Sequence, residues 1–399
     1  MIQRSQCIAN IKAGYLFPEI AKRKKEYLQT YPDAKIISLG IGNTTEPIPP
    51  HINEGLINGA KALGFEKTYS GYGEEQGNSI LREKIAAVLY QGLVSADEIF
   101  ISDGAKCDIG RFQVLFGSDI HVAVQDPSYP VYVDGSVLTG SAGAHNGMGY
   151  QGITYLPCTA DNGYFPDLGQ ILQNSLIYFC SPNNPTGAVA DRAQVSALVD
   201  IATRKKCLII FDAAYSEYIR DSAFPKSIYE IEGAKSCAIE INSFSKSAGF
   251  TGVRLGWSVV PRDLKYASGE SMNRDWNRIC TTIFNGASNI AQAGGVAALD
   301  EQGLKEMHSL TDYYMHNALL IRGAMQKLGI GCTGGENSPY IWAYFGRDSW
   351  EVFADLLEKC QIVSTPGSGF GPAGQGFIRF SAFGHAADIE EACRRLARF

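Results

Sequence analysis

Short apolar runs alternate with amphipathic stretches between about residue 98 and residue 260. The runs are continuously apolar, which is typical of strands that a parallel sheet buries on both faces. The stretches between them have the apolar spacing of helices. The predicted strands are EIFIS (98–102), IHVAVQD (120–126), LIYFCS (176–181), CLIIFD (207–212), CAIEIN (237–242) and LGWSVV (255–260).

The predicted helices of this region span residues 104–116, 128–138 and 191–205, and a further long helix begins at about residue 263. Strands that alternate with helices indicate an α/β domain, in which helices cover both faces of a mostly parallel sheet. Residues 140–152 are glycine-rich and are expected to form an irregular connection.

The pattern changes after about residue 300, where a smaller α+β domain is expected. Its predicted elements are a helix at 301–328, a strand at 340–345, a helix at 349–359, a strand at 377–383 and a final helix to Arg398. Residues 1–35 are predicted to form an arm and a helix, with Pro18 near its start. The expected division is 1–48 as the arm and part of the small domain, 49–295 as the large domain, and 296–399 as the small C-terminal domain.

Length and composition agree with two globular domains, since the chain has 399 residues, 45% of them hydrophobic and 19% charged. The net charge of −6 and the lack of a basic stripe argue against nucleic-acid binding. No apolar stretch approaches the length of a membrane span, and the first residues lack the apolar core of a signal peptide. The scattered cysteines form no CxxC pairs, and the histidines show no metal-ligand spacing. We therefore expect a cytoplasmic protein that binds no membrane and no metal.

Residues that could carry chemistry follow the predicted strands: Ser102, Asp126, Ser181, Asp212 and Ser243 each stand at or just after a strand end. In an open α/β sheet, ligands bind beyond the carboxyl ends of the strands. We therefore expect these segments to form one site.

Lys246 lies in SFSKSAGFTGVRLG, immediately after a predicted buried strand. Desolvation can lower the pKa of such an amine towards neutrality, which makes it a candidate Schiff-base nucleophile. Ser243, Ser245 and Arg254 surround it in the sequence and suit a phosphate dianion. An amine beside a phosphate site is what an enzyme dependent on pyridoxal 5′-phosphate requires.

The segment SDGAKCDIGRF (102–112) combines a strand end, a glycine turn and a helix start. The N–H groups at a helix N-terminus attract phosphate, although many helices that bind nothing begin with such residues. A P-loop would need GxxxxGK[ST], which is absent, and no GxGxxG follows the first strand as in a dinucleotide-binding domain.

Two other strand ends allow both a structural and a functional interpretation. SPNNPTG (181–187) has the composition of an ordinary turn, yet Asn184 could donate a hydrogen bond to a ligand. Asp212 could cap a helix, or it could keep the pyridine nitrogen of the cofactor protonated. Tyr215 could pack in the core, or it could donate a hydrogen bond to a phenolate oxygen.

Arg379 lies inside the apolar strand FIRFS, where an unpaired guanidinium would be very costly. One interpretation is a structural salt bridge. The other is a fork that binds the α-carboxylate of a substrate.

Together, SPNNPTG, FDAAY, SFSK followed by GVRLG, and FIRFS resemble the class I/II aminotransferases of PLP fold type I, in the family's order and across nearly the whole chain. The resemblance implies Lys246 as the catalytic lysine, which also moves the proton, and Asp212 at the pyridine nitrogen. It implies Tyr129 stacked on the ring and Arg379 at the substrate carboxylate. It further implies a homodimer with shared active sites, in which Tyr72 reaches the partner subunit's phosphate. The other implied cofactor ligands are Asn184 and Tyr215 at the phenolic oxygen, and Ala105, Lys106, Ser243, Ser245 and Arg254 around the phosphate.

A narrower resemblance, to the family of LL-diaminopimelate aminotransferases, is carried by GYLFPEIAKR (14–23), LGIGNTTEP (39–47), SGYGEEQG (70–77), SDGAKCDIGR (102–111), SFSKSAGFTGVRLGW (243–257) and FNGASNIAQAGG (284–295). That family transfers an amino group between glutamate and tetrahydrodipicolinate, in lysine and cell-wall precursor synthesis. The resemblance implies that Tyr15, Gly42, Lys106 and Asn285 line the substrate pocket, with Tyr129, Asn184 and Arg379. We add Glu75 of the neighbouring subunit as a hypothetical ligand for the distal ammonium of the substrate; a solvated helix-start acid is the alternative.

Three rival functions stay open at this point. Decarboxylation, elimination or amino transfer from another amino acid, such as aspartate, would use most of the same residues. A transcription regulator on the same fold would need a DNA-binding segment, for which the short arm offers little room. An NAD-dependent oxidoreductase would lack the yellow colour of a lysine-bound pyridoxal cofactor.

Overall fold

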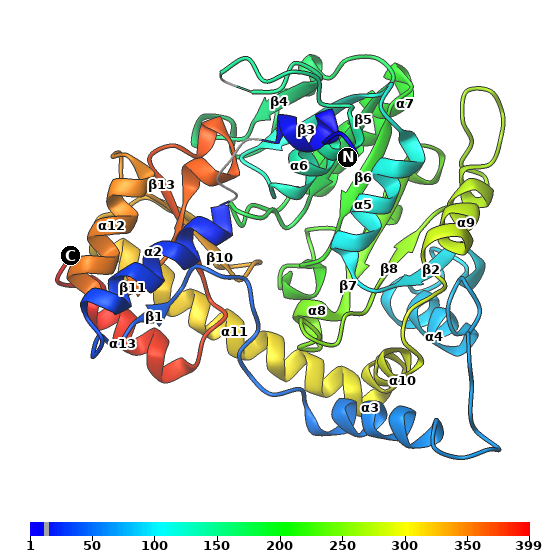
Figure 1. Ribbon diagram of the computed structural model, residues 1–399, viewed down its shortest axis with the longest axis horizontal. Coiled ribbons are helices and arrows are strands. Elements are labelled where there is room, and N and C mark those ends of the chain that lie inside the picture. The colour runs from blue at the N-terminus through cyan, green and yellow to red at the C-terminus, as the bar shows by residue number, and fades with distance from the viewer. Residues whose placement is uncertain (12–15, 148) are drawn as a thin grey trace.

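A seven-stranded sheet forms the centre of the larger of two lobes in the computed structural model, which describes residues 1–11, 16–147 and 149–399 (Figure 1). The strand order is β2-β8-β7-β6-β5-β3-β4. Strands β3 to β7 run parallel to one another, whereas β8 runs antiparallel to both β2 and β7. The strands are β2 (Ile99–Ser102), β3 (His121–Asp126), β4 (Ile153–Pro157), β5 (Ser175–Cys180), β6 (Leu208–Asp212), β7 (Ala238–Ser243) and β8 (Gly256–Val259).

Two hydrophobic clusters lie on the strands of this sheet, because side chains alternate between its faces. Ile209 and Phe211 of β6 belong to one cluster, while Leu208 and Ile210 belong to the other. Both clusters are closed by helices, so every residue of β5, β6 and β7 is buried. The helices of this lobe are α3 (Pro50–Ala62), α4 (Ser79–Lys84), α5 (Ala105–Phe116), α6 (Val131–Thr139), α7 (Arg192–Lys205), α8 (Phe244–Ser247), α9 (Met272–Ile283) and α10 (Asn289–Ala298).

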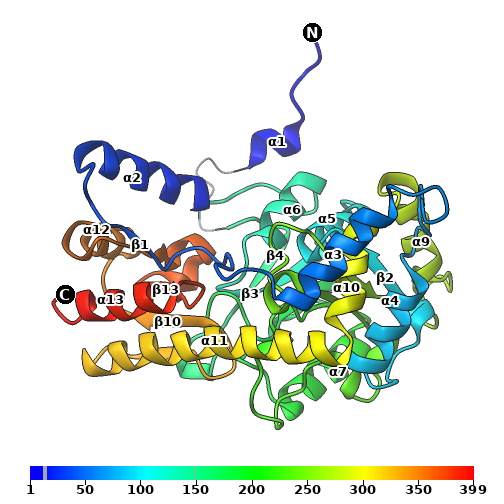
Figure 2. The same cartoon turned by 90° about the horizontal axis from the view of Figure 1, so that it is seen from below.

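The smaller lobe joins the two ends of the chain around a third hydrophobic cluster, which combines residues between 16 and 39 with residues from Leu310 onwards and also includes Tyr215 and Tyr218 from the segment after β6. Its four-stranded antiparallel sheet has the order β12-β13-β10-β9, and β1 pairs with β11 beside it. The long helix α11 extends from the large lobe along the small one (Figure 2). The elements are α2 (Leu16–Thr30), β1 (Ile37–Ser38), α11 (Glu301–Lys327), β9 (Cys332–Gly334), β10 (Tyr340–Tyr344), α12 (Ser349–Cys360), β11 (Ile362–Val363), β12 (Thr365–Pro366), β13 (Phe377–Ser381) and α13 (Ala386–Leu396), with the short α1 (Gln6–Asn10) in the arm.

The predicted α/β architecture is confirmed, and all six predicted strands of the large lobe are present. The long helix predicted from about residue 263 is wrong, because α9 begins only at Met272. Lys265 and Ser271 form an antiparallel bridge, and Gly269 between them has φ +98°, which a helix does not allow. Ser271 then caps α9 by accepting from the Arg274 N–H.

The domain boundaries at 48/49 and 295/296 stay predictions. None of the helices in the described residues combines the length and the apolar character that crossing a bilayer requires.

Candidate active site

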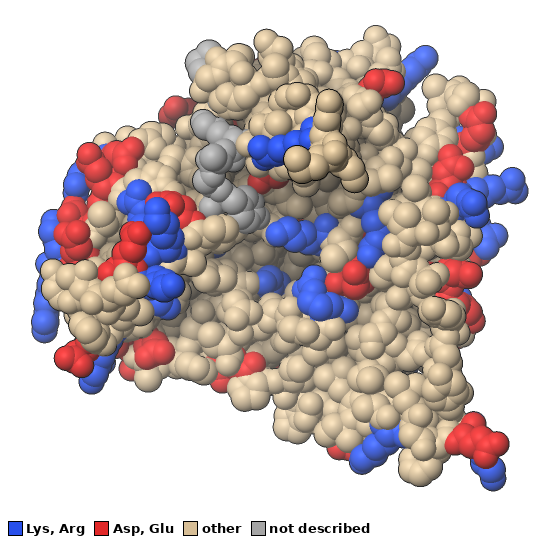
Figure 3. Space-filling view, viewed as in Figure 1, with Lys and Arg blue, Asp and Glu red and all other residues tan. Residues whose placement is uncertain are grey.

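The carboxyl ends of β5, β6 and β7 open into a cavity of about 660 Å³ between the two lobes. Figure 3 shows a hollow on this face, with Lys and Arg atoms in and around it. Among the described residues, the cavity is lined by four cationic side chains but by only one acidic side chain, that of Asp212. A cleft with this excess of positive charge favours anionic ligands.

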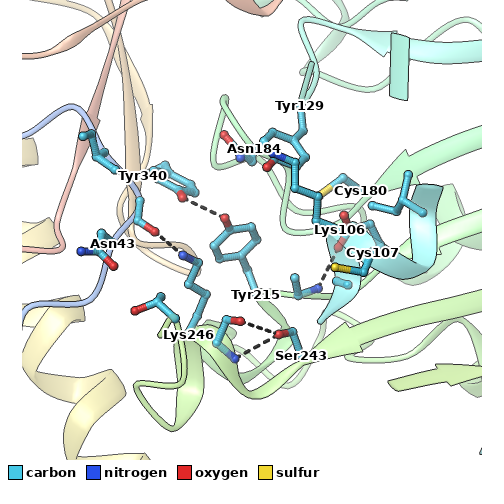
Figure 4. A pocket seen from close by; sticks show the side chains of 18 of the residues that line it. Asn43, Lys106, Cys107, Tyr129, Cys180, Asn184, Tyr215, Ser243, Lys246 and Tyr340 are labelled. Carbon is cyan, nitrogen blue, oxygen red and sulfur yellow. Dashed lines mark hydrogen bonds between the residues drawn. The ribbon is translucent and has the colours of Figure 1, made fainter. Parts of the chain in front are cut away.

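Lys246 extends into the cavity from α8, the short helix that directly follows β7 (Figure 4). Its Nζ donates a hydrogen bond to the carbonyl oxygen of Gly42, which belongs to the segment after β1. Burial, with smaller contributions from the positive charges of Arg379 and Arg254, lowers the pKa of this amine to about 7. The amine is therefore half deprotonated near neutral pH, as a nucleophile or proton carrier requires.

Hydroxyl and guanidinium groups gather beside Lys246 at the edge of the sheet. Ser243 and Ser245 share a hydrogen bond of 2.8 Å between their hydroxyl oxygens, and Nη1 of Arg254 lies 3.3 Å from Oγ of Ser245. The Arg254 guanidinium packs against Gly104, which precedes the first turn of α5. A Cβ at Gly104 would lie 2.3 Å from Nη2 of Arg254, and the φ of +118° also favours glycine.

These groups surround the N-terminus of α5, where Ala105 and Lys106 line the cavity. A helix N-terminus, two hydroxyls and an arginine are the chemistry that binds a phosphate dianion. The structure thus brings together the residues that the sequence analysis grouped as a candidate phosphate site, and their binding of an anion stays a prediction.

Asp212 ends β6 with its carboxylate buried at the cavity floor. Oδ2 accepts a hydrogen bond of 2.7 Å from the hydroxyl of Tyr132, and Oδ1 accepts one of 3.1 Å from the N–H of Ala214. Burial raises the pKa of the carboxyl, while the bond from Tyr132 opposes that rise. A cationic ring nitrogen beside Asp212 would offset the cost of burying its charge.

Asn184 and Arg379 form a hydrogen-bonded pair on the other side of the cavity. Oδ1 of Asn184 accepts a bond of 2.6 Å from Nη1 of Arg379, so the amide nitrogen of Asn184 is its donor end. Nη2 of Arg379 donates to the carbonyl oxygen of Gly40. The turn at 181–187 therefore also supplies a side chain, Asn184, that contacts Arg379 in the cavity.

Arg379 is only 1% exposed, and no acidic oxygen lies within salt-bridge distance of it in the described part of the chain. Its guanidinium carbon is 4.4 Å from the ring centroid of Tyr340 and 4.8 Å from that of Phe370. Nε of Arg379 has no hydrogen-bond partner among the residues that the structure describes. A structural salt bridge therefore does not explain Arg379, whereas a carboxylate ligand in the cavity would pair its charge.

A family model of the class I and II aminotransferases matches residues 34–396 of the sequence. The chain belongs to the class I and II aminotransferases. Among its relatives, the LL-diaminopimelate aminotransferase of Protochlamydia amoebophila is 53% identical, over 99% of this chain and 97% of the relative. The chloroplastic LL-diaminopimelate aminotransferase of Arabidopsis thaliana is 52% identical, over 99% of this chain and 86% of the relative.

A solved structure from the same family is close to this one over its full length. The LL-diaminopimelate aminotransferase of Chlamydomonas reinhardtii superposes with a TM-score of 0.97 and is 55% identical, covering 100% of this chain and 98% of the other. The family membership and the fold type predicted from the motifs are thereby confirmed.

The aminotransferase cavity of this chain brings together twelve of the predicted site residues, which come from separate segments of the sequence. They are Gly42, Ala105, Lys106, Tyr129, Asn184, Asp212, Tyr215, Ser243, Ser245, Lys246, Arg254 and Arg379. Their individual roles stay predictions.

Tyr72, Glu75 and Asn285 are exposed and lie outside the lining of this cavity. Tyr72, with 88% of its surface accessible, lines a second cavity together with Asn289. Asn289 donates hydrogen bonds to Ser70 and Gly71, which ties the segment of Tyr72 to the segment after Asn285. Tyr15 lies outside the described residues.

Tyr132 and Tyr340 also line the cavity and contact predicted site residues, but neither was predicted from the sequence. Tyr132 bonds to Asp212, and Tyr340 bonds to Tyr215 through a contact of 2.8 Å between the hydroxyl oxygens. Tyr129 and Tyr132 both fall in the helix predicted for residues 128–138, where a spacing of three could have indicated a shared face, although α6 begins only at Val131. Tyr340 lies 125 residues from Tyr215, and no local pattern connects the two.

Proposed function

We propose that this chain transfers an amino group between glutamate and tetrahydrodipicolinate, forming LL-diaminopimelate and 2-oxoglutarate in lysine and peptidoglycan precursor synthesis. The observation that carries this proposal is the 53% identity over 99% of the chain with a relative named LL-diaminopimelate aminotransferase. A cytoplasmic location remains a prediction.

We propose pyridoxal 5′-phosphate as the cofactor, because the cavity has suitable groups for each of its parts. When bound, this cofactor withdraws electrons from the carbon that carries the amino group. Lys246 would hold it through its amine, and Ser243, Ser245 and Arg254 would bind its phosphate. Asp212, the one acidic residue among the described residues that line the cavity, would pair with its ring nitrogen.

Three side chains would then act on the substrate. Arg379 binds the α-carboxylate with a guanidinium that is already held by Asn184 and Gly40. Such prior orientation reduces the entropy lost on binding. Lys246, with a pKa of about 7, accepts and returns the proton of the substrate's α-carbon. Tyr129, which also lines the cavity, would limit the tilt of the cofactor ring.

The distal end of the substrate carries both an ammonium and a carboxylate. We propose that Lys106 and Asn285 bind this carboxylate, and that Glu75 of a second subunit binds the ammonium. The exposure of Tyr72, Glu75 and Asn285 supports a homodimer in which each subunit completes the other's site, since none of the three lines the active-site cavity formed by the described residues of its own chain.

A panel of amino donors tests the proposed reaction. With 2-oxoglutarate as acceptor, LL-diaminopimelate should form glutamate, whereas aspartate and lysine should form much less. The meso isomer measures the stereochemical preference, and omission of 2-oxoglutarate is the control. Activity with aspartate but none with LL-diaminopimelate would leave an aminotransferase and contradict the proposed substrate.

The rate at which the cofactor-free protein takes up pyridoxal 5′-phosphate should rise with pH around a midpoint of about 7. Below the midpoint Lys246 is protonated and cannot attack a carbonyl, and above it the amine is neutral. The uptake rate is measured from the appearance of visible absorbance after mixing. The measurements run from pH 5.5 to pH 9, which is roughly 1.5–2 units on either side of the midpoint. A rate that keeps rising towards the ordinary lysine pKa of about 10.4 would contradict it.

A further inference from the structure

Tyr340 connects the two lobes at the active site. It begins β10 in the small lobe, is 1% exposed, and points its hydroxyl at Tyr215, which follows β6 in the large lobe (Figure 4). The two hydroxyl oxygens are 2.8 Å apart, and the ring centroids are 5.1 Å apart in an edge-on arrangement. This hydrogen bond therefore depends on the relative position of the lobes.

The ring of Tyr340 also contacts the arginine of the carboxylate site. The guanidinium carbon of Arg379 lies 4.4 Å from the centroid of the Tyr340 ring. β10 and β13 are neighbouring antiparallel strands, so the two side chains come from one small sheet. A stacked aromatic ring both attracts a guanidinium and restricts its rotation.

The hydroxyl of Tyr340 lies close to the backbone that contacts the lysine. A Cβ at Gly42 would be 2.2 Å from this hydroxyl oxygen, so only glycine fits there. The carbonyl oxygen of the same Gly42 accepts the hydrogen bond from Lys246. Tyr340 thus stands among three groups of the proposed mechanism: Tyr215, Arg379 and Lys246.

The main chain of Tyr340 is itself closely held. Cβ atoms at Gly187 and Gly334 would lie 2.6 Å and 2.1 Å from its carbonyl oxygen, and both glycines have positive φ angles. Gly187 ends the turn that carries Asn184. Tyr340 is therefore fixed against the turn that holds the other partner of Arg379.

We propose that Tyr340 is a positioning residue, which directs the Tyr215 proton towards the phenolic oxygen of the cofactor and holds Arg379 in place for the carboxylate. This inference rests on the proposed function. A tyrosine hydroxyl has one proton to donate. Either hydroxyl could donate in the bond between Tyr215 and Tyr340. We take Tyr340 as the donor, which leaves the proton of Tyr215 for a different acceptor. Burial raises the pKa of both tyrosines, so both retain their protons at neutral pH.

The test is the pH titration of the visible absorbance of the holoenzyme. Donation to the phenolic oxygen stabilises its anionic form. Tyr340→Phe, which keeps the ring but removes the hydroxyl, should therefore shift the titration midpoint upwards by about 0.4–1 pH unit. Tyr344→Phe, an exposed tyrosine on the same strand, is the matched control and should leave the midpoint unchanged.

A double variant separates positioning from a general structural effect. Tyr215→Phe should raise the midpoint by itself, and adding Tyr340→Phe should then cause no further shift, because Tyr340 acts through Tyr215. Additive shifts, or an unchanged midpoint in Tyr340→Phe, would overturn the proton-directing role. A wild-type protein that gains no visible band with pyridoxal 5′-phosphate would instead overturn the proposed function.

A second variant tests the contact with Arg379. Tyr340→Leu also removes the ring, and it should raise the KM for glutamate by about 2- to 30-fold over that of Tyr340→Phe. Equal KM values in the two variants would overturn the role of the ring.

Discussion

Replacing Lys246 with alanine is expected to lower kcat by at least about 10³-fold and to remove the visible absorbance of the bound cofactor. Among the described residues, two lysines line the cavity, Lys106 and Lys246. The Lys246 pKa of about 7 suits proton transfer, and its amine is the proposed attachment point. Steady-state kinetics with glutamate and an absorbance spectrum of the purified variant measure both effects.

Lys265→Ala is a suitable control for this variant, because Lys265 is exposed and lies outside the cavity. It should retain the kcat and the spectrum of the wild type. Lys246→Ala protein that retains wild-type turnover would show that another group moves the proton, and the assigned chemistry would be wrong.

Arg379→Lys is expected to reduce kcat/KM for glutamate by about 10²- to 10³-fold, even though the positive charge remains. A lysine ammonium cannot bind a carboxylate with two parallel hydrogen bonds. It also cannot reproduce the present contacts, in which the guanidinium donates to Asn184 and Gly40 and stacks on Tyr340. Kinetics with varied glutamate measure the loss.

The affinity of Arg379→Lys for the cofactor distinguishes a specific loss of substrate binding from a general disruption of the active site. Arg379 should matter little for cofactor retention, so titration of the cofactor-free variant with pyridoxal 5′-phosphate should give a Kd within about threefold of the wild type. Arg262→Lys, at an exposed ion pair with Asp97, is the control substitution. Equal losses of substrate and cofactor binding would argue against a specific carboxylate site.

The sequence was sufficient to predict the parts of the fold that depend on continuous burial. β5, β6 and β7 are buried at every position, so their apolar runs were distinct, and the polar residues at their ends marked the site. β4 was not predicted, because it lies at the sheet edge, is only partly buried and has a mixed sequence. The antiparallel direction of β8 was not predicted either, because a continuously apolar run does not indicate the direction of its strand.

Within the site, the sequence indicated groups but not their mutual contacts. Arg379 was recognised as a buried charge in need of an anion, yet its aromatic neighbours come from other strands and loops. The contacts of Tyr340 with Tyr215 and of Gly104 with Arg254 join residues that are far apart in the sequence. Such contacts depend on how the two lobes and the loops pack, which local patterns do not encode.

The reversed direction of β8 limits how the chain can change in length. Ser243 at the end of β7 pairs with Gly256 at the start of β8, so the intervening residues form one loop closed at its base. Lys246 and Arg254 both lie on that loop. Loops usually tolerate insertions and deletions. Here, the insertion or deletion of one residue between Lys246 and Arg254 would change the distance between the two cations, even if every strand kept its register. The length of this loop is therefore as restricted as that of an element in the core.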